Sequence, residues 1–472
     1  WLKHAIDISK RMEGRHIFLL CFNFISVLLY SGTVFGWTAL SQILISEGFY
    51  SYFCESTESS CDAQRDALSK AFTYASTATG LCALPAGWLM DKAGPFTTIL
   101  VGGSIEIVSL IGIALCEIEW KAYHFDVFPI CLVGLAVAGT LIRLCGYQCA
   151  FVFPRKSNLL IALASVLFDG SCMVFPTLRV LYKAGLSFQN VFLIYAFLGI
   201  AIFIFLPIGW QLHSVEIADA RAVARAGQIS SEQEGLASMP LQSQLNSFEF
   251  AVILLFSVVQ LPRSNLYLGS VDAVNAQIAR ETDTSEHLEF VNTVVAWVIP
   301  LGFLAIPAIT ASIRYFGNIG SLAITSLLGV LLNALQCITS LYLQVITVCV
   351  FAVFRAFLFS NVPQFNKHYF GILTMGRIQG ICFLAGGLAN LVQAPLITWS
   401  LFSLRGDFQP LIVLCLLANL PPLVSCVSLM WYRHRSHRLA RTLAGSPRHD
   451  NLLPNVLDEA GDSVISLQPQ ED

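Results

Sequence analysis

Ionisable side chains stand inside several long apolar stretches of this chain, and four of them are its clearest candidates for chemistry. Arg143, Arg263 and Arg355 each lie in such a stretch, and Asp169 lies in another. Charged groups in apolar surroundings are costly, so each of them is a candidate for a functional role. Arginine offers a planar fork of donors that matches a carboxylate, and an aspartate can receive an ammonium group. We expect Arg263 or Arg355 first to hold a ligand carboxylate.

Each of these residues also has a purely structural interpretation. A buried arginine can pair with a neighbouring acid, or its long side chain can reach the membrane surface. Asp169 can be the partner of Arg143 or Arg263 instead of receiving an ammonium group. For Glu106, in another apolar stretch, we expect either a pair with Arg143 or a protonated, neutral carboxyl. The sequence leaves these alternatives open.

Helix-breaking, aromatic and amide residues complete the candidate pocket. Gly36 and Tyr30 lie in the first apolar stretch, where glycine can let backbone groups reach a ligand. Small residues equally permit close helix packing, which we expect for Gly32. Asn265 and Asn361 are amides within apolar stretches, suited to binding a polar ligand or a neighbouring helix.

Twelve apolar stretches position these residues, and each is about long enough to cross a membrane, which takes about 20 residues. Hydrophobic residues make up 56% of the chain and charged residues 12%, against about 25% charged in soluble domains. A buried core helix would explain one such stretch but not twelve in succession, so we predict an all-α polytopic membrane protein. The stretches lie near 17–45, 69–90, 96–118, 125–150, 158–182, 189–211, 247–270, 288–312, 319–341, 343–363, 369–395 and 408–432.

The stretches divide six and six around one polar segment at 212–246. We predict an N-terminal six-helix bundle over 17–211 and a C-terminal six-helix bundle over 247–435. A cytoplasmic segment at 1–16 precedes them, and a disordered cytoplasmic tail at 436–472 follows. Two related bundles predict a solute site between them, near the middle of the membrane.

The distribution of basic residues predicts the orientation of the chain. Lys and Arg gather before the first stretch, in alternate loops and after the last stretch, whereas the opposite loops hold more acids. The positive-inside rule therefore places both termini in the cytoplasm. We expect the plasma membrane, with an endomembrane as the alternative. The basic residues are Lys3, Lys10, Arg11, Arg15, Lys92, Arg155, Lys156, Arg221, Arg225, Arg314, Lys367, Arg433, Arg435, Arg438 and Arg441.

Two cysteines fall in the polar loop 46–68, which this orientation places outside. Cys54 and Cys61 are close in sequence and would meet an oxidising exterior, which favours a disulfide between them. The alternative is two free thiols.

A loop motif lies between the second and third stretches, at Gly87-Trp-Leu-Met-Asp91-Lys92-Ala-Gly94. It resembles the Gly-x-x-x-Asp-Arg/Lys-x-Gly motif of the major facilitator superfamily. Its glycines permit a tight turn, and its aspartate can cap a helix or pair with a basic residue of a neighbouring helix. The resemblance implies a gate that holds the cytoplasmic side closed in one state.

A closer resemblance is to the solute carrier 43 family, and it covers roughly residues 30–430. It implies the major facilitator fold and a facilitative carrier that moves large neutral amino acids by alternating access. The apicomplexan amino-acid transporters resemble the same family. Arg143 and Glu106 depart from the family pattern, which has an apolar and an uncharged residue there. The matching segments include Gly36-Trp37, Phe168-Asp169-Gly170-Ser171, Gln260-Leu-Pro-Arg263, Arg355-Ala-Phe-Leu-Phe359 and Tyr369-Phe370-Gly371.

Motifs typical of enzymes are absent from the sequence. It has no P-loop, no His-Glu-x-x-His, no paired Cys-x-x-Cys and no nucleophile elbow. We therefore expect no enzyme, no catalytic residue, no metal and no cofactor. The expected partners are an amino acid as substrate and the lipid bilayer, with no nucleic acid and a monomeric chain.

Two other functions remain open from the sequence. The first is a proton-coupled symporter of amino acids or another small organic solute, with Asp169 or Glu106 as the titrating group. The second is a non-transporting sensor or scaffold that signals through residues 212–246 or 436–472.

Overall fold

The computed structural model describes residues 17–54, 61–116, 126–152, 157–215, 218–219, 222–223 and 236–444. All of its regular secondary structure is helical, and these residues contain no strand. The predictions for segment 1–16, for most of the central segment and for the tail after 444 lie outside the described residues. So do the basic residues predicted at Lys3, Lys10, Arg11, Arg15, Arg155, Lys156, Arg221 and Arg225.

The N-terminal half, residues 17–215, begins with a broken helix. A first helix at Ile17–Tyr30 meets a second one at Thr33–Ser46 with a bend of 41°. The second consists of η1 (Thr33–Gly36) and α2 (Trp37–Ser46). The remaining elements are η2 (Ser51–Phe53), α3 (Asp62–Leu81), α4 (Ala83–Ala114), α5 (Val127–Val152), α6 (Ser157–Gly170), η5 (Ser171–Met173), α7 (Val174–Lys183) and α8 (Phe188–Leu212).

The C-terminal half, residues 236–444, contains longer helices. The last helix continues to Ala444, beyond residue 435, where we expected the disordered tail to begin. The elements are η6 (Leu236–Ser238), α10 (Leu241–Leu245), α11 (Phe248–Glu281), η7 (Ser285–His287), α12 (Leu288–Val298), η8 (Ile299–Ala305), α13 (Ile306–Gln336), α14 (Leu343–Asn390), α15 (Gln393–Thr398), a π-helical turn (Trp399–Ser403), α16 (Gln409–Ala418) and α17 (Leu420–Ala444).

Three of the longest helices are interrupted at a glycine. Gly94 in α4, Gly317 in α13 and Gly371 in α14 have φ values of 76°, 71° and 77°, with ψ values of 179°, 177° and 166°. Side chains other than hydrogen rarely adopt this backbone conformation, so each position requires glycine. The helix axis is kinked at these points, and each marks the end of one apolar segment and the start of the next.

Nine helices of the described residues are long and apolar enough to cross a membrane, or ten if the bent first pair is one span. The sequence predicted twelve. The second predicted span, 69–90, is divided between α3, which does not qualify because it carries several charged side chains, and the start of α4. The predicted eighth and ninth spans run together as one stretch at Ser285–Gln336, which contains the bend at Gly317.

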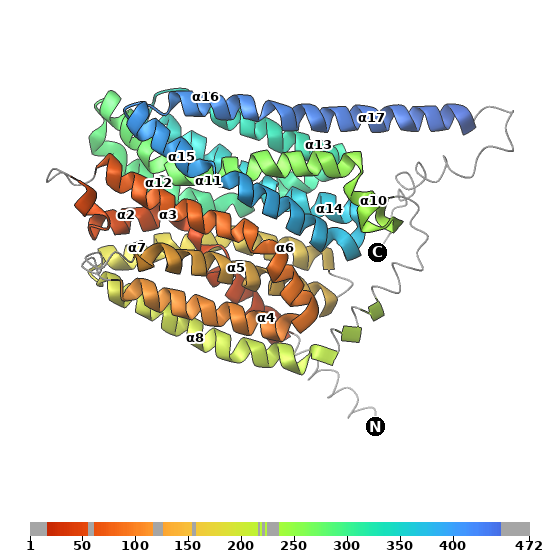
Figure 1. Ribbon diagram of the computed structural model, residues 1–472, viewed down its shortest axis with the longest axis horizontal. Helices are drawn as coiled ribbons and strands as arrows, with labels where there is room; N and C mark the ends of the chain where they lie inside the picture. Colours follow the sequence, from red (N-terminus) through yellow and green to blue (C-terminus); the bar gives the residue numbers. More distant parts are fainter. Residues whose placement is uncertain are drawn as a thin grey trace.

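The helices pack as two groups with contacts between them. In the N-terminal half α4 packs most extensively on α5 and α8, and in the C-terminal half α14 packs on α11 and α13. Helices α3 and α14 make the largest contact between the groups. In Figure 1 the red-to-yellow helices occupy the lower part of the molecule and the green-to-blue helices the upper part.

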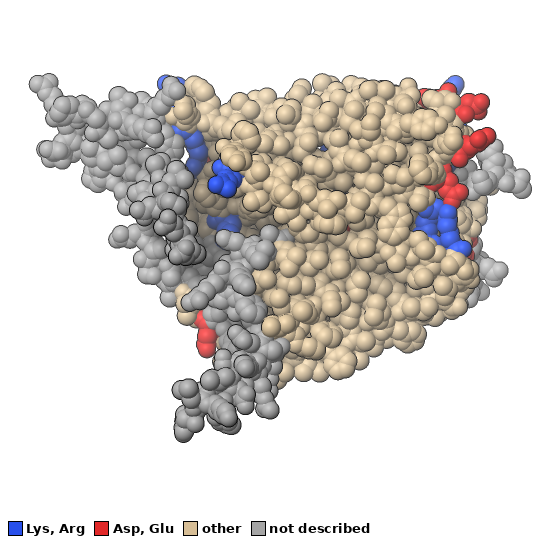
Figure 2. Space-filling model, turned by 180° about the vertical axis from the view of Figure 1, so that it is seen from behind, with Lys and Arg blue, Asp and Glu red and all other residues tan. Residues whose placement is uncertain are grey.

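The outer surface fits a lipid environment. On the face in Figure 2, charged side chains gather near the two ends and the band between them is almost free of charge. Large apolar side chains such as Val108, Phe197 and Leu304 are 70%, 67% and 66% exposed. In water such a surface would be unfavourable, whereas in a bilayer it is the surface expected of a spanning helix bundle.

Candidate functional site

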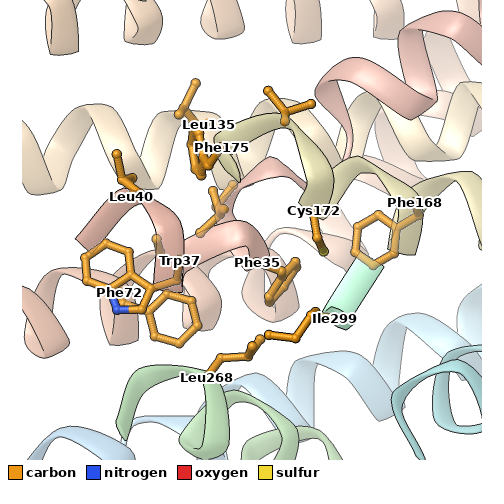
Figure 3. Close-up of a cluster of buried hydrophobic side chains, with 14 of the residues drawn as sticks. Phe35, Trp37, Leu40, Phe72, Leu135, Phe168, Cys172, Phe175, Leu268 and Ile299 are labelled. Atoms are coloured by element: carbon orange, nitrogen blue, oxygen red, sulfur yellow. The ribbon is translucent and has the colours of Figure 1, made fainter. Parts of the chain in front are cut away.

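The centre of the molecule lies where two helices break opposite each other. The first span breaks into η1, and α6 passes through η5 into α7; these two short turns pack together. Figure 3 shows Phe35, Phe168 and Cys172 of the N-terminal half near Leu268 and Ile299 of the C-terminal half. All five side chains are buried. The two halves therefore meet through an apolar cluster at this point.

The glycines of the first span are packing residues in this structure. A methyl group on Gly32 would lie 2.6 Å from the Phe168 carbonyl oxygen, and one on Gly36 would lie 2.5 Å from the Cys172 carbonyl oxygen. Both glycines thus allow the two broken helices to approach closely. Tyr30 points into the N-terminal half, where it stacks on Tyr195 with ring centroids 4.8 Å apart. Neither Gly36 nor Tyr30 lines the cavity described below.

An ion pair joins the two halves beside this cluster. Arg355 of α14 reaches Asp169 of α6, with Nε 3.2 Å from Oδ1, and the two side chains are only 2% and 7% exposed. The guanidinium lies between two rings, 4.4 Å from the centroid of Phe35 and 4.8 Å from that of Phe359. Of the alternatives left open for Asp169, the structure shows pairing with an arginine, but with Arg355 instead of Arg143 or Arg263.

A cavity lies next to the ion pair, and Arg143 is its only ionisable lining residue among the described ones. Arg143 is 4% exposed, its Nε has no hydrogen-bond partner within the described residues, and it makes no ion pair there. Its guanidinium carbon lies 4.6 Å from the ring centroid of Phe168 and 5.3 Å from that of Phe383. The other lining residues are Phe35, Ser76, Thr79, Gly80, Leu261, Asn265, Phe359, Gly386 and Gly387.

A polar network supports the wall of this cavity. Asn390 of α14 donates its Nδ2 to Ser76 Oγ and to Thr77 Oγ1 of α3, both at 3.0 Å. Asn265 of α11, which lines the cavity, donates to Asn390 Oδ1 at 3.3 Å. These amides and hydroxyls link helices of both halves around the cavity.

Two residues of the predicted site lie elsewhere. Arg263 donates to Asn333 Oδ1 and to Gln336 Oε1 (2.9 Å) of α13, so it joins two helices of the C-terminal half and does not line the cavity. Asn361 donates to Ser321 O at 3.2 Å, also on α13. Asn361 thus binds a neighbouring helix, as in its structural alternative, whereas Arg263 binds two neutral amides instead of the acid that its structural alternative expected.

Glu106 is an isolated carboxyl inside the N-terminal half. It is 0% exposed in α4, and neither of its oxygens has a hydrogen-bond partner within the described residues. It makes no ion pair with Arg143 there. An unpaired charge at such a place would be strongly unfavourable, so Glu106 fits the neutral, protonated alternative.

Sequence reasoning missed the polar lining that α3 contributes. Ser69, Thr73, Ser76 and Gly80 are spaced by three or four residues and lie on one face of the helix, which turns toward the C-terminal half. A stripe of small and polar residues at helical spacing was the signal for this face. The prediction of the second span began at residue 69 and depended on apolar content, so this polar face was not recognised.

The loop motif ends in the Gly94 bend. Asp91 and Lys92 are exposed, and Lys92 Nζ lies 4.5 Å from the ring centroid of Trp88. Asp91 makes no ion pair with the described residues. A methyl group on Gly87 would meet no atom within 4 Å, so space does not require glycine there.

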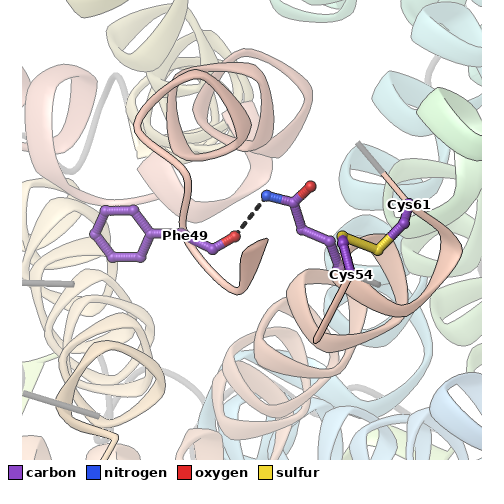
Figure 4. The surroundings of a disulfide bond; sticks show 4 residues. Phe49, Cys54 and Cys61 are labelled. Carbon is purple, nitrogen blue, oxygen red and sulfur yellow. Dashed lines mark hydrogen bonds between the residues drawn. A yellow bond between two sulfur atoms is a disulfide. The ribbon is translucent and has the colours of Figure 1, made fainter. Parts of the chain in front are cut away.

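At the opposite end of the molecule, Cys54 and Cys61 form a disulfide (Figure 4). Near it, Gln64 Nε2 donates to the Phe49 carbonyl oxygen at 2.7 Å, which ties the start of α3 to the segment after α2.

Polar contacts hold the two halves together at this same end, where α2, α7 and α12 lie in Figure 1. Ser41 donates to Asp272 at 2.5 Å. Glu289 pairs with Lys183 and, at 3.6 Å, with Arg179. Each contact joins a residue before 215 to one after 236, so this end is closed between the halves.

No protein-family model matches the chain, but several known proteins are similar to it. Protein FMP42 of Saccharomyces cerevisiae is 24% identical over 448 residues, which cover 79% of this chain and 86% of the yeast protein. Amino acid transporter 6-1 of Toxoplasma gondii is 24% identical over 435 residues, or 81% of this chain and 73% of that protein. Large neutral amino acids transporter small subunit 3 of Homo sapiens is 27% identical over 215 residues, or 42% of this chain and 38% of the human protein.

The apolar helices and these relatives together define the class: the chain is an integral, multi-pass membrane protein. More particularly, it is related over much of its length to proteins named as amino-acid transporters. Transporters of this kind are not enzymes.

Proposed function

We propose that this protein moves amino acids, large neutral ones first, across a membrane by alternating access and without obligatory ion coupling. The observation that carries the proposal is the cavity between the halves, which is lined by the amide of Asn265 and by Arg143, whose guanidinium makes no ion pair with the described residues. The guanidinium suits a carboxylate and the amide oxygen suits an ammonium group. The rings of Phe359 and Phe383 suit an apolar side chain.

The proposed architecture is the twelve-span major facilitator fold. Counting the bent first pair as one span raises the nine candidate spans to ten. Taking α3 with the part of α4 before Gly94 adds an eleventh, and dividing Ser285–Gln336 at Gly317 adds the twelfth. We assign bundles to 17–211 and 247–435, with both termini cytoplasmic, in a monomer of the plasma membrane.

In this proposal the two halves rock around the cavity. The end closed by Ser41, Asp272 and Glu289 is the outer gate, and its contacts break when the site opens outward. The segment from Gly87 to Gly94 takes the matching role on the cytoplasmic side, with Asp91 and Lys92 as its charged members. Alternation of this kind requires only a site that each state exposes to one side.

Uptake into proteoliposomes tests the proposal. The purified chain is reconstituted without an ion gradient, and labelled leucine is offered together with unlabelled competitors. We expect uptake that approaches equilibrium and is reduced by excess unlabelled leucine. The exposed residue Arg377 provides the matched control, since Arg377→Gln removes one arginine away from the cavity and should transport like the parent chain. Absence of uptake by correctly inserted protein would refute the proposal.

The same assay separates a carrier from a sensor or scaffold. A chain that ends at residue 444 retains every described helix, so as a carrier it should keep its uptake. Loss of function on this truncation, with the protein still inserted, would favour the signalling alternative.

Proton-coupled symport is the second candidate, and the isolated carboxyl of Glu106 is the observation that favours it. A neutral carboxyl inside the membrane can carry a proton if another state gives it water or a cationic partner. Coupling predicts that an inward proton gradient drives leucine above equilibrium and that Glu106→Gln abolishes this accumulation. Uptake that is the same at mildly acidic and neutral pH, with or without a gradient, would rule coupling out.

A further inference from the structure

We propose that the Arg143 cavity also accepts apolar monocarboxylates that lack an ammonium group, such as the 2-oxo acid of leucine, α-ketoisocaproate. The inference rests on the proposed function, because it assigns a further substrate class to the same cavity. It follows from the charges around the cavity and from the polar groups that face an incoming ligand.

The charges at the centre of the molecule do not balance. Arg143 and Arg355 contribute two guanidinium groups, and Asp169 is the one carboxylate of the described residues that lies near both of them. Arg355 takes Asp169 as its partner, which leaves the charge of Arg143 uncompensated among the described residues. Glu106 does not line the cavity and makes no ion pair there. A ligand with one negative charge therefore completes the charge balance, whereas a zwitterion does not.

Among the described residues, the cavity wall has no carboxylate that could receive an ammonium group. Its polar lining residues, Ser76, Thr79 and Asn265, are neutral. The hydroxyl of Ser76 already accepts a hydrogen bond from Asn390, and Asn265 already donates to the same residue. An ammonium group one carbon away from a carboxylate bound to Arg143 would thus meet a like charge and only neutral oxygens. The ammonium group is tolerated here but is not what the site selects.

The rest of the wall suits the aliphatic end of such an acid. Leu261, Phe359 and Phe383 supply apolar surface, and Gly80 and Gly386 let the helices that line the cavity approach one another closely. A methyl group on Gly386 would lie 2.8 Å from Leu261 Cδ1, and one on Gly80 would lie 2.6 Å from the Phe383 carbonyl oxygen. An isobutyl group attached to a carboxylate needs this combination of one cation and an apolar wall.

Competition between three compounds of the same carbon skeleton tests the inference. The full chain in proteoliposomes takes up labelled leucine in the presence of α-ketoisocaproate, which keeps the carboxylate, or leucinol, which keeps the ammonium group. Uptake of labelled α-ketoisocaproate is measured separately. We expect α-ketoisocaproate to compete within about threefold of unlabelled leucine and to be taken up itself. We expect leucinol to compete at least about tenfold more weakly, since tenfold corresponds to about 1.4 kcal/mol.

Variants of Arg143 assign the effect to this residue. Arg143→Gln should reduce uptake of labelled α-ketoisocaproate at least about tenfold, and Arg143→Lys, which retains the charge, should restore part of it. Arg377→Gln, on the exposed surface, is the matched control and should take up α-ketoisocaproate like the parent chain. If Arg143→Gln does not fold, the lysine variant and the three compounds still decide the question.

The outcomes separate this inference from the proposed function. Leucine uptake that α-ketoisocaproate does not inhibit would overturn the inference and leave the amino-acid carrier intact. Uptake of α-ketoisocaproate without uptake of leucine would support the inference and refute the amino-acid carrier. Inhibition by leucinol as strong as that by α-ketoisocaproate would also overturn the inference, because it would show selection for the ammonium group.

Discussion

Neutralising one member of the Arg355–Asp169 pair should destabilise the protein far more than neutralising both. The two atoms are 3.2 Å apart and the side chains are almost fully buried. At an effective dielectric constant of about 20, two unit charges at this distance attract each other by about 5 kcal/mol. Much of this attraction offsets the cost of taking both groups out of water. Asp169→Asn or Arg355→Gln alone leaves a buried charge without its partner, which typically costs about 3–5 kcal/mol.

The double variant Asp169→Asn/Arg355→Gln contains neither charge, so we expect it to recover most of the loss. Thermal unfolding of the purified protein in detergent measures the effect, and each single variant should lower the apparent melting temperature by several degrees. The four proteins form a double-mutant cycle, in which the coupling between the two positions should exceed about 2 kcal/mol. Single variants as stable as the parent chain, or additive losses in the double variant, would refute a buried ion pair between the halves.

Three other perturbations have expected outcomes in the same stability assay. Gly80→Ala would place a methyl group 2.6 Å from a backbone carbonyl oxygen and should lower the free energy of unfolding by about 1–3 kcal/mol. The control is the exposed Gly376→Ala, whose methyl group would meet no atom within 4 Å and which should be neutral or stabilising. Equal effects of the two variants would contradict the close contact of α3 with α14. Cys54→Ser removes a disulfide with a sequence separation of 7 and should lower the free energy of unfolding by about 2–3 kcal/mol. A reducing agent should destabilise the parent chain by the same amount and leave the variant unchanged. Tyr50 donates its hydroxyl to Asp126 at 2.6 Å, so Tyr50→Phe should cost about 1.5–3 kcal/mol at neutral pH. Burial and the Asp126 carboxylate raise the pKa of Tyr50 above its usual value of about 10. The stability difference between the parent chain and Tyr50→Phe should therefore be complete below about pH 10 and shrink above it. A stability difference that grows with pH would contradict the hydrogen bond from Tyr50 to Asp126.

Apolar length and helix-breaking residues were enough to predict most helices. The stretches expected at 125–150, 189–211 and 408–432 correspond to α5, α8 and α16 with α17. Helix α11 was predicted to end near residue 270 and instead continues to Glu281, because its last turns face the protein interior and need not be apolar throughout. The break between Tyr30 and Thr33 was not predicted, since a helix can bend without any change in its apolar content.

The individual members of the site were harder to predict than the helices that carry them. All three arginines that the sequence singled out are buried, but the sequence could not tell which one makes no ion pair or hydrogen bond with the described residues. Arg263 is satisfied by Asn333 and Gln336, more than 60 residues away in sequence, and Arg355 by Asp169 in the other half. Only the arrangement in space leaves Arg143 facing the cavity, and no local pattern around it carries that information.

The most direct test of this account is uptake of labelled leucine by proteoliposomes that contain the parent chain, Arg143→Gln or Arg377→Gln, without an ion gradient. The account predicts saturable uptake by the parent and by Arg377→Gln, and a loss of at least about tenfold in Arg143→Gln. Equal uptake by Arg143→Gln would contradict a substrate site at this cavity. No uptake by any of the three, although each is inserted and folded, would contradict transport of amino acids itself.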